Sequence, residues 1–140
     1  GTGLSGVALT AAGFSTIDGF DLSDEMLALA EQKKAYRSLA PLDLSGPLPF
    51  ADESFANAAA IGVIAPELMP MTVIDEMLRV LPSGGCLVFS ANDHAAADGR
   101  IAGRIMELTD CGYAELLFSE YGEHLPELEL QSTVTVLRRR

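Results

Sequence analysis

Apolar residues recur along this chain at two spacings, and segments with one spacing alternate with segments that have the other. A period of three to four residues, typical of an amphipathic helix, begins at Leu4 and is stopped by Gly13. Similar patterns predict further helices at residues 23–34, 72–81 and 97–109. We therefore expect four helices, separated by shorter apolar segments.

The shorter segments predict β-strands at residues 16–21, 37–42, 55–64 and 86–90, followed by two strands at 114–118 and 132–137. Pro41 lacks an amide hydrogen and favours a sheet edge or a strand end. The segment 55–64 is rich in alanine, so a helix is an alternative there. Strands that alternate with helices predict an α/β fold: a Rossmann-like, mostly parallel sheet with helices on both faces and a C-terminal antiparallel hairpin.

Composition and charge exclude several classes of partner. The chain has 140 residues, of which 49% are hydrophobic, and this suits a single globular domain. A formal charge of −11 repels phosphate backbones, so we expect no nucleic-acid partner. No apolar segment approaches the ~20 residues of a membrane span, and no signal-like start is present. We therefore expect no membrane partner and a cytoplasmic location, while the oligomeric state is not indicated.

The two cysteines and the C-terminal arginines are interpreted as structural features and not as functional sites. Cys86 and Cys111 lie far apart, without a histidine pair nearby, so we expect buried, reduced thiols and no metal site. The run of three arginines at 138–140 follows a predicted strand. We interpret it as a solvated tail rather than a binding patch.

Three glycines and one acid carry most of the functional information. Gly1, Gly3 and Gly6 form the pattern G-x-G-x-x-G at the start of the first helix, and Asp21 stands at the tip of the next strand. A glycine turn lets the backbone approach a ligand and presents unpaired amides, while a carboxylate accepts hydrogen bonds from ribose hydroxyls. The glycine turn and Asp21 together predict a binding site for a nucleoside cofactor. The same spacing fits a dinucleotide domain, and a structural alternative is a tight turn with Asp21 capping the following helix.

Four candidate residues fall where strands of the expected sheet end at their carboxyl side. They are Gly3, Asp21, Asp43 and Gly62. Ligands of open parallel sheets bind outside the carboxyl ends of the strands. We therefore expect these residues to lie along one rim, although Asp43 could instead cap the turn that follows it.

Four motifs follow one another along the chain: G-T-G-L-S-G at 1–6, D-L-S-D-E-M-L at 21–27, L-P-F-A-D-E-S-F at 48–55 and L-P-S-G-G at 81–85. This ordered set resembles class I S-adenosylmethionine-dependent methyltransferases. The closing part, from Asn92-Asp93-His94 through Glu120-Tyr121-Gly122, is similar to the Williams–Beuren region methyltransferase-like subgroup. The resemblance covers almost the whole chain and implies S-adenosylmethionine as the cofactor.

The resemblance also implies roles for individual residues. The cofactor-binding residues would be Gly1, Thr2, Gly3, Asp21, Leu22, Met26, Asp43, Leu44 and Gly62. The glycine turn would lie against the methionine part of the donor, Asp21 would hold both ribose hydroxyls, and Asp43 would face the adenine amine. The three apolar side chains would flank the adenine ring, although Met26 suits core packing equally well.

The chain departs from the family pattern at two places. The family has a strand and an acidic residue just before the glycine turn, whereas Gly1 is the first residue here. We expect the natural polypeptide to extend upstream by at least one helix and one strand, so that the first strand is missing from this chain. Ala56 stands where the family often has an aspartate, and we expect little effect on the chemistry.

Methyl transfer from a sulfonium requires mainly positioning of the acceptor and exclusion of water. A general base helps when the acceptor is an oxygen or nitrogen acid, and His94, with Asp93 as its partner, is the candidate. The alternative for His94 is a loop residue that caps the last helix. Tyr121 and His124, expected in the loop between the terminal strands, are candidates for lining the acceptor pocket together with Glu120 and Glu123, and a solvated hairpin loop is the alternative. We expect a small-molecule acceptor; the competing hypotheses are a nicotinamide or flavin dinucleotide domain and a non-catalytic interaction module with this fold.

Overall fold

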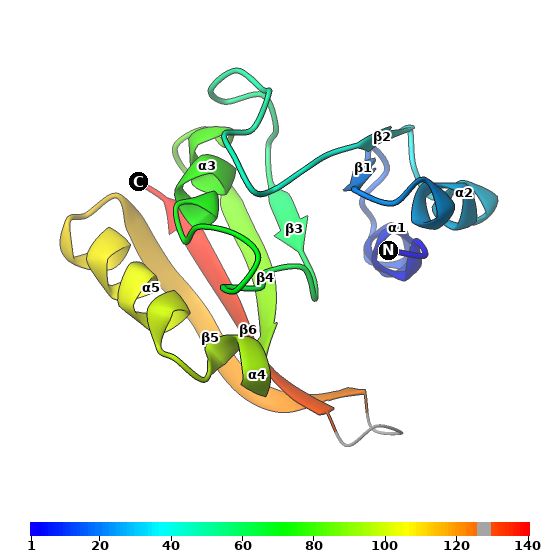
Figure 1. Cartoon of the computed structure of the whole chain (residues 1–140). Helices are drawn as coiled ribbons and strands as arrows, with labels where there is room; N and C mark the ends of the chain where they lie inside the picture. Colours follow the sequence, from blue (N-terminus) through cyan, green and yellow to red (C-terminus); the bar gives the residue numbers. More distant parts are fainter. Residues whose placement is uncertain (126–129) are drawn as a thin grey trace. The chain divides into compact units, whose positions relative to one another are not determined.

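The computed structural model describes residues 1–125 and 130–140, with side chains described for residues 1–123 and 131–140. Its contacts divide the chain into two compact units, Gly1–Asp43 and Leu44–Arg140 (Figure 1). Each unit is described by itself below. The single-domain organisation expected from composition stays a prediction.

The first unit is built from two parallel strands and two helices. Its elements are α1 (Leu4–Ala11), β1 (Asp18–Asp21), α2 (Asp24–Gln32) and β2 (Ser38–Pro41), all labelled in Figure 1. The strands pair in parallel, with Asp18 opposite Ser38 and Asp21 opposite Pro41. Pro41 is the last residue of its strand, in agreement with its missing amide hydrogen.

Two glycines of the first unit leave room for the ring of Tyr36. A Cβ atom on Gly6 would lie 2.3 Å from Tyr36 Cζ, and one on Gly19 would lie 2.7 Å from Tyr36 Cδ1. The Gly6 amide also donates a 2.9 Å hydrogen bond to the Tyr36 hydroxyl. Because even a methyl group at either glycine would collide with the ring, both glycines are required for packing.

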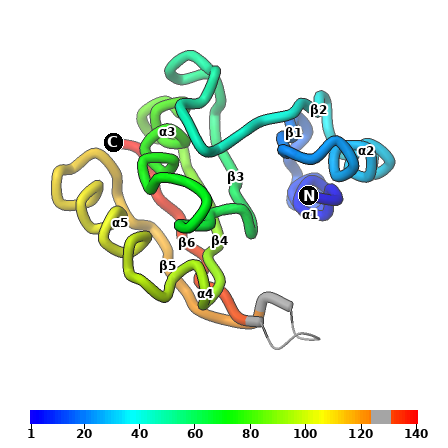
Figure 2. Tube along the Cα trace, in the orientation of Figure 1, coloured from blue at the N-terminus to red at the C-terminus, as the bar shows by residue number. Residues whose placement is uncertain are grey.

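The second unit is a mixed four-stranded sheet with helices packed against it. Its elements are β3 (Ala58–Ala60), α3 (Val73–Arg79), β4 (Cys86–Asn92), α4 (Asp93–Ala96), α5 (Arg100–Asp110), β5 (Ala114–Leu125) and β6 (Leu130–Arg139). The strand order is β3-β4-β6-β5, in which β3 and β4 are parallel and β6 is antiparallel to both of its neighbours. Figure 2 traces the two long terminal strands beside β4. The predicted α/β class and the C-terminal antiparallel hairpin are confirmed.

The core of the second unit lies on one face of this sheet. Leu87 of β4 and Leu137 of β6 stand opposite each other and are fully buried, as are Ile74 and Leu78 of α3. Figure 1 shows α3 and α5 drawn across the same face of the sheet. Val88 points to the other face, because side chains alternate along a strand, and it is only half-buried.

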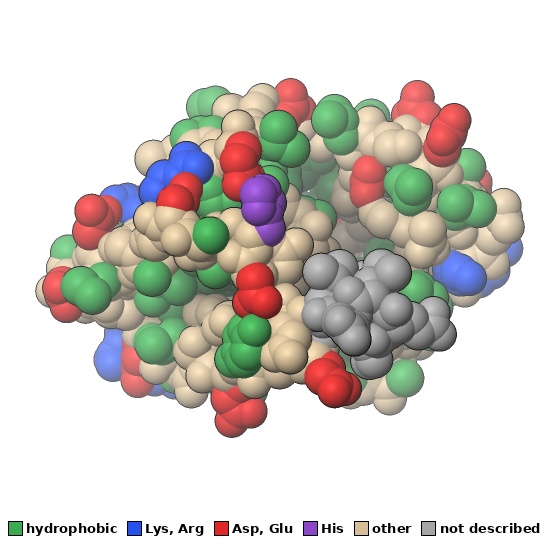
Figure 3. All heavy atoms as spheres, turned by 60° about the horizontal axis from the view of Figure 1, so that its bottom comes forward, with side chains coloured by type: hydrophobic (Ala, Val, Ile, Leu, Met, Phe, Trp, Pro, Cys, Tyr) green, Lys and Arg blue, Asp and Glu red, His purple; other side chains and the backbone are tan. Residues whose placement is uncertain are grey.

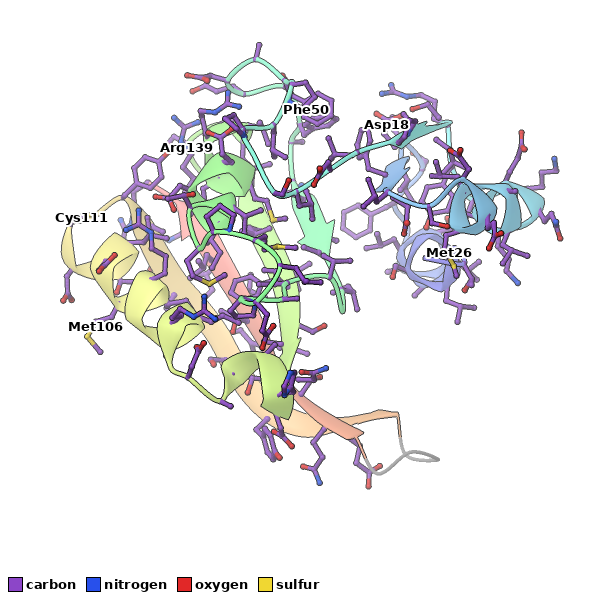
Figure 4. The ribbon with its side chains drawn as sticks, viewed as in Figure 1. Asp18, Met26, Phe50, Met106, Cys111 and Arg139 are labelled. Atoms are coloured by element: carbon purple, nitrogen blue, oxygen red, sulfur yellow. The ribbon has the colours of Figure 1, made fainter. Side chains whose placement is uncertain are left out.

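Arg139 ties the last strand to the end of α3. Its guanidinium donates hydrogen bonds to the carbonyl of Leu81 and, over 3.2 Å, to the carbonyl of Arg79, and it lies 5.8 Å from the centroid of the Tyr113 ring (Figure 4). The side chain is 17% exposed. The two flanking arginines both pair with Glu115. The prediction of a solvated arginine tail is therefore wrong for Arg139, because this residue is the last of β6 and its guanidinium binds backbone carbonyls.

Several predicted boundaries are also wrong. The strand expected over residues 55–64 is only the three residues of β3. The helix expected over 97–109 corresponds to α5, which begins at Arg100 after Gly99, whose φ is 75°, and the short helix α4 lies before the expected range. The terminal strands are longer than expected, so Tyr121 lies within β5 and not in a loop. The side chain of His124 lies outside the described residues.

Both cysteines are free thiols, but their burial differs from the expectation. Cys86 is half-buried, and Cys111 is exposed at the end of α5, where Figure 4 labels it. The prediction of a buried thiol is therefore wrong for Cys111. None of the helices that the structure describes is long and apolar enough to cross a membrane.

Candidate functional site

The carboxyl ends of β1 and β2 bring two candidate acids to one edge of the first unit. Asp21 ends β1 and stands opposite Pro41, which ends β2. The Leu42 amide donates a 3.0 Å hydrogen bond to the Asp21 carbonyl, so the chain continues beside Asp21 before it reaches Asp43. Because the strands are parallel, both acids follow the same end of this small sheet.

The glycine turn meets the same edge. The backbone nitrogen of Gly1 donates a hydrogen bond to the Asp21 carboxylate. Gly3 is the N-cap residue before α1 and has φ 91° and ψ 7°, a left-handed conformation that favours glycine. A Cβ atom on Gly3 would also lie 2.9 Å from the Cα atom of Ala30 in α2. The turn thus combines a required glycine conformation with close contact to the neighbouring helix.

Hydrogen bonds keep the Asp21 carboxylate ionised. Partial burial raises the pKa of Asp21, but hydrogen bonds from the backbone nitrogen of Gly1 and from the Ser23 and Leu22 amides outweigh it, so the pKa lies below its ordinary value. The Ser23 amide donates to Asp21 Oδ1 over 2.9 Å. The carboxylate therefore remains an acceptor near neutral pH, as a ligand with hydroxyl donors requires.

Apolar groups accompany this carboxylate. Leu22 follows Asp21 and is 71% exposed, which is unusual for a large aliphatic side chain. Met26 lies on α2, where Figure 4 labels it, and is half-buried; its amide donates a 3.3 Å hydrogen bond to Ser23 Oγ, the cap of the helix. An exposed leucine beside an ionised acid suits a ligand that has both a flat apolar face and hydroxyl groups.

The third glycine of the pattern does not offer its amide to a ligand. The sequence predicts unpaired amides at the turn, but the Gly6 amide is already bound to the Tyr36 hydroxyl. That part of the prediction is wrong for Gly6. Tyr36 was not selected from the sequence. Its only sequence signal is that Gly6 and Gly19 have no side chain, which leaves space for the tyrosine ring.

Two further candidates, Leu44 and Gly62, belong to the second unit. Gly62 follows β3 with φ 68°, and its amide donates a 2.9 Å hydrogen bond to the Oγ atom of Ser90 in β4. Ser90 is buried and was not singled out from the sequence. It fixes the glycine at the carboxyl end of β3. Leu44 is half-buried.

The predicted base, His94, is placed differently from the expectation. It lies in α4, which Asn92 caps, so His94 is not the helix cap. Its Nε2 atom lies 3.4 Å from Glu67 Oε1, whereas Asp93 accepts a 3.1 Å hydrogen bond from Tyr121. Glu67, and not Asp93, is therefore the partner of the histidine. Figure 3 shows a histidine side chain, in purple, open on a face that also carries acidic groups in red.

The sequence matches one protein family, described as a methyltransferase domain, over residues 1–89. The chain belongs to this methyltransferase family. The matched stretch contains the glycine turn, both edge acids and Gly62. No protein of curated function matches the sequence.

Solved structures with the same fold include S-adenosylmethionine-dependent methyltransferases from three organisms. The Methanosarcina mazei enzyme is 18% identical, with 99% of this chain and 88% of that chain covered and a TM-score of 0.74. The Mesorhizobium loti enzyme is 18% identical, with coverages of 99% and 87% and a TM-score of 0.72. A TehB-like enzyme from Corynebacterium glutamicum is 21% identical, with coverages of 100% and 76% and a TM-score of 0.68. At these identities the similarity concerns the fold.

S-adenosylmethionine is the cofactor that membership of the methyltransferase family indicates. The residues present fit this group: Asp21 is an ionised acceptor, Leu22 is an exposed apolar side chain, and Gly3 brings backbone without a side chain to the same edge. Among the described residues, no group of three or more histidine, cysteine or acidic side chains could hold a metal ion. A cavity of about 480 Å³ between α2 and the start of β2 does not include these residues.

Proposed function

We propose that this methyltransferase domain binds S-adenosylmethionine through the edge of the first unit and transfers the methyl group to a small-molecule acceptor. The observation that carries the proposal is the meeting of the glycine turn with Asp21 at the carboxyl end of β1. The family match over residues 1–89 supports the reaction class. The assignment to the Williams–Beuren region subgroup remains part of this proposal.

Each proposed binding residue has a role that its chemistry supports. Asp21 accepts hydrogen bonds from the two ribose hydroxyls, and Asp43 faces the adenine amine. Leu22 and Met26 cover the faces of the adenine ring, and Leu44 stays a predicted contact of the cofactor. Gly1, Thr2 and Gly3 lie against the methionine part, where backbone must come close, and Gly62 stays a predicted contact of the cofactor. When bound, the cofactor supplies a methyl group on a positively charged sulfur.

The net charge of the chain supports the proposed acceptor class, and the two free thiols support the proposed location. With 20 acidic and 9 basic side chains, the chain repels polyanions, so a small neutral or cationic acceptor is favoured over nucleic acid. The two free cysteines suit a reducing compartment, which supports the cytoplasm as the proposed location.

Calorimetric titration with S-adenosylmethionine tests the proposed cofactor site. Charge-assisted hydrogen bonds contribute roughly 1.5–3 kcal/mol each, so Asp21→Asn should weaken binding at least about tenfold. Asparagine keeps the acceptor that holds the Ser23 amide, so the local fold is retained. Glu25→Gln removes an exposed acid in the first turn of α2 and serves as the matched control.

The outcome also separates the competing functions. Saturable binding of the methyl donor that Asp21→Asn weakens and Glu25→Gln does not would support the proposal. Tight binding of NADH with no binding of the donor would favour a dinucleotide domain. Absence of binding for both at millimolar concentrations would contradict the proposal and favour a non-catalytic module.

A further inference from the structure

Two proton-carrying side chains stand near the carboxyl end of β4, and each is paired with a carboxylate. The strand ends at Asn92, whose side chain caps α4. His94 lies on α4 with its Nε2 atom 3.4 Å from Glu67. Tyr121 of β5 donates a 3.1 Å hydrogen bond to Asp93. One close nitrogen–carboxylate contact and one hydrogen bond thus occur near the end of one strand, where ligands of α/β sheets bind.

The segment that carries Glu67 is held in place by its neighbours. The Arg100 guanidinium donates a 2.7 Å hydrogen bond to the Pro66 carbonyl, and the Leu68 amide donates a 2.9 Å hydrogen bond to the Ala65 carbonyl. Leu68 is nevertheless 77% exposed. A leucine on a tethered turn, next to the histidine pair, is suited to contact the hydrocarbon part of a bound molecule.

Glu67 determines which nitrogen of His94 is free to accept a proton. Nε2 faces the Glu67 carboxylate, and the neutral imidazole that can donate to this acceptor is the form with its hydrogen on Nε2 and its lone pair on Nδ1. The His94 side chain is 86% exposed. Nδ1 is therefore accessible to a molecule that approaches from solution.

The Tyr121 phenol keeps its own proton. The hydrogen bond to Asp93 raises the pKa of Tyr121 above its ordinary value. The hydroxyl therefore continues to donate to Asp93, while the lone pairs of its oxygen remain able to accept an N–H group. The phenol acts as an acceptor for a ligand and not as a base.

The surrounding charge decides which acceptor chemistry fits. Glu123 lies two residues after Tyr121 on β5 and points to the same face, and Arg100, a basic side chain of this region, is paired with Asp98 over 2.5 Å. Deprotonating a hydroxyl acceptor would create a second negative charge beside Glu67. An amine acceptor binds as an ammonium ion, and its methylated product is also an ammonium ion. An acidic surface therefore attracts both the substrate and the product of amine methylation.

We propose that Glu67, Leu68, Asp93, His94 and Tyr121 form an acceptor-binding surface, the amine surface, for a primary or secondary amine with an apolar substituent. The inference rests on the proposed methyl transfer and deepens it by naming the acceptor class. His94 is the catalytic residue. Glu67 and Asp93 are positioning residues that orient the imidazole and the phenol.

The proton transfer balances without any further reactant. The ammonium group gives one N–H proton to Nδ1 of His94, and the electron pair of that bond remains on the amine nitrogen. The imidazole becomes an imidazolium ion, whose charge Glu67 balances. The neutral amine then carries the electron pair that a methyl acceptor requires.

Amide chemical-shift mapping with three probes tests the surface without any methyl donor. Benzylamine, benzyl alcohol and benzoate share one ring and differ in charge. We expect saturable shifts at the amides of residues 67, 68 and 94 with benzylamine, weaker effects with benzyl alcohol and none with benzoate. Equal or tighter binding of benzoate, or shifts confined to other elements, would overturn the proposal.

Charge-removing variants test whether the individual carboxylates contribute to benzylamine affinity. An exposed charge pair contributes up to about 1 kcal/mol, so Glu67→Gln and Asp93→Asn should each weaken benzylamine binding about threefold. Asp110→Asn removes the same charge at the exposed end of α5 and should leave the affinity within about twofold. Equal affinities in all three variants would contradict the assigned roles.

Kinetics then test the role of His94. In a methyl-transfer assay with benzylamine, His94→Gln should lower kcat by about a hundredfold with KM nearly unchanged, whereas Leu68→Ala should raise KM. An unchanged kcat in His94→Gln would overturn the catalytic role. If the donor binds but no amine maps to this surface, the present inference fails and the proposed function stands; if benzylamine maps here but the donor does not bind, the proposed function fails.

Discussion

Replacing Gly6 with alanine is expected to destabilise the protein although alanine is the better helix former. A Cβ atom at this position would lie 2.3 Å from Tyr36 Cζ and 2.5 Å from its hydroxyl oxygen. Ordinary contact between carbon atoms begins near 3.5 Å, so the ring must move by about 1 Å. The movement also disturbs the 2.9 Å hydrogen bond between the Gly6 amide and the Tyr36 hydroxyl.

The expected cost follows from three opposing contributions. Overpacking of this kind costs about 1–3 kcal/mol, and loss of the hydrogen bond costs about 0.5–1.5 kcal/mol. Alanine in a helix gains up to about 1 kcal/mol over glycine. The free energy of unfolding should therefore fall by about 2 kcal/mol, which for a chain of this size lowers Tm by roughly 6–10 °C.

Urea denaturation followed by circular dichroism measures this change, and Gly103→Ala is the matched control. Gly103 also lies inside a helix, α5, but a Cβ atom there would meet nothing within 4 Å. This variant should gain about 0.5–1 kcal/mol. In the double variant Gly6→Ala/Tyr36→Ala the collision is absent, so a coupling energy of at least about 1 kcal/mol should appear. Equal effects of the two glycine substitutions, or strict additivity in the double variant, would refute the packing argument.

Other predictions concern pH, thiol access and ligand affinity. The Arg79 guanidinium lowers the pKa of Glu76, so the pair stabilises the folded state at pH values above the ordinary pKa of 4.5, and this contribution is lost as the pH falls through the lower pKa of the folded state. In urea titrations at several pH values, the free energy of unfolding of Glu76→Gln should therefore fall less steeply with decreasing pH than that of the parent. One thiol should react rapidly with a disulfide reagent in the native protein, and Cys111→Ser should remove that fast phase while the slower reaction of Cys86 remains. Leu22→Ala should leave unfolding within ~0.5 kcal/mol of the parent but weaken donor binding about fivefold by calorimetry, because the side chain is exposed; a large loss of stability would place Leu22 in the core instead.

Sequence periodicity predicted the elements of the first unit well. Ser23 is a helix cap followed by two acids, and this local pattern is sufficient to start α2 at Asp24. Asp21 falls at a strand tip because the turn signal follows it directly. Such features depend on residues close in sequence, so they were accessible without a structure.

Features that depend on distant residues were not predicted. The run around Ala58 has no periodicity because its side chains are small, so nothing showed that the strand pairs with β4 over only three residues. The role of Arg139 depends on the carbonyls of Leu81 and Arg79, which lie 58 and 60 positions earlier in the chain. The pairing of His94 with Glu67 likewise joins two segments whose meeting no local pattern encodes.

The most direct test of the cofactor site is an amide chemical-shift titration with S-adenosylhomocysteine, the demethylated form of the cofactor. We predict saturable shifts concentrated at Thr2, Gly3, Leu22 and Ser23, and their loss in Asp21→Asn. Saturable binding whose shifts avoid these amides and fall instead around the 480 Å³ cavity at Tyr36 and Arg37 would contradict the assignment of the site to the glycine turn and Asp21.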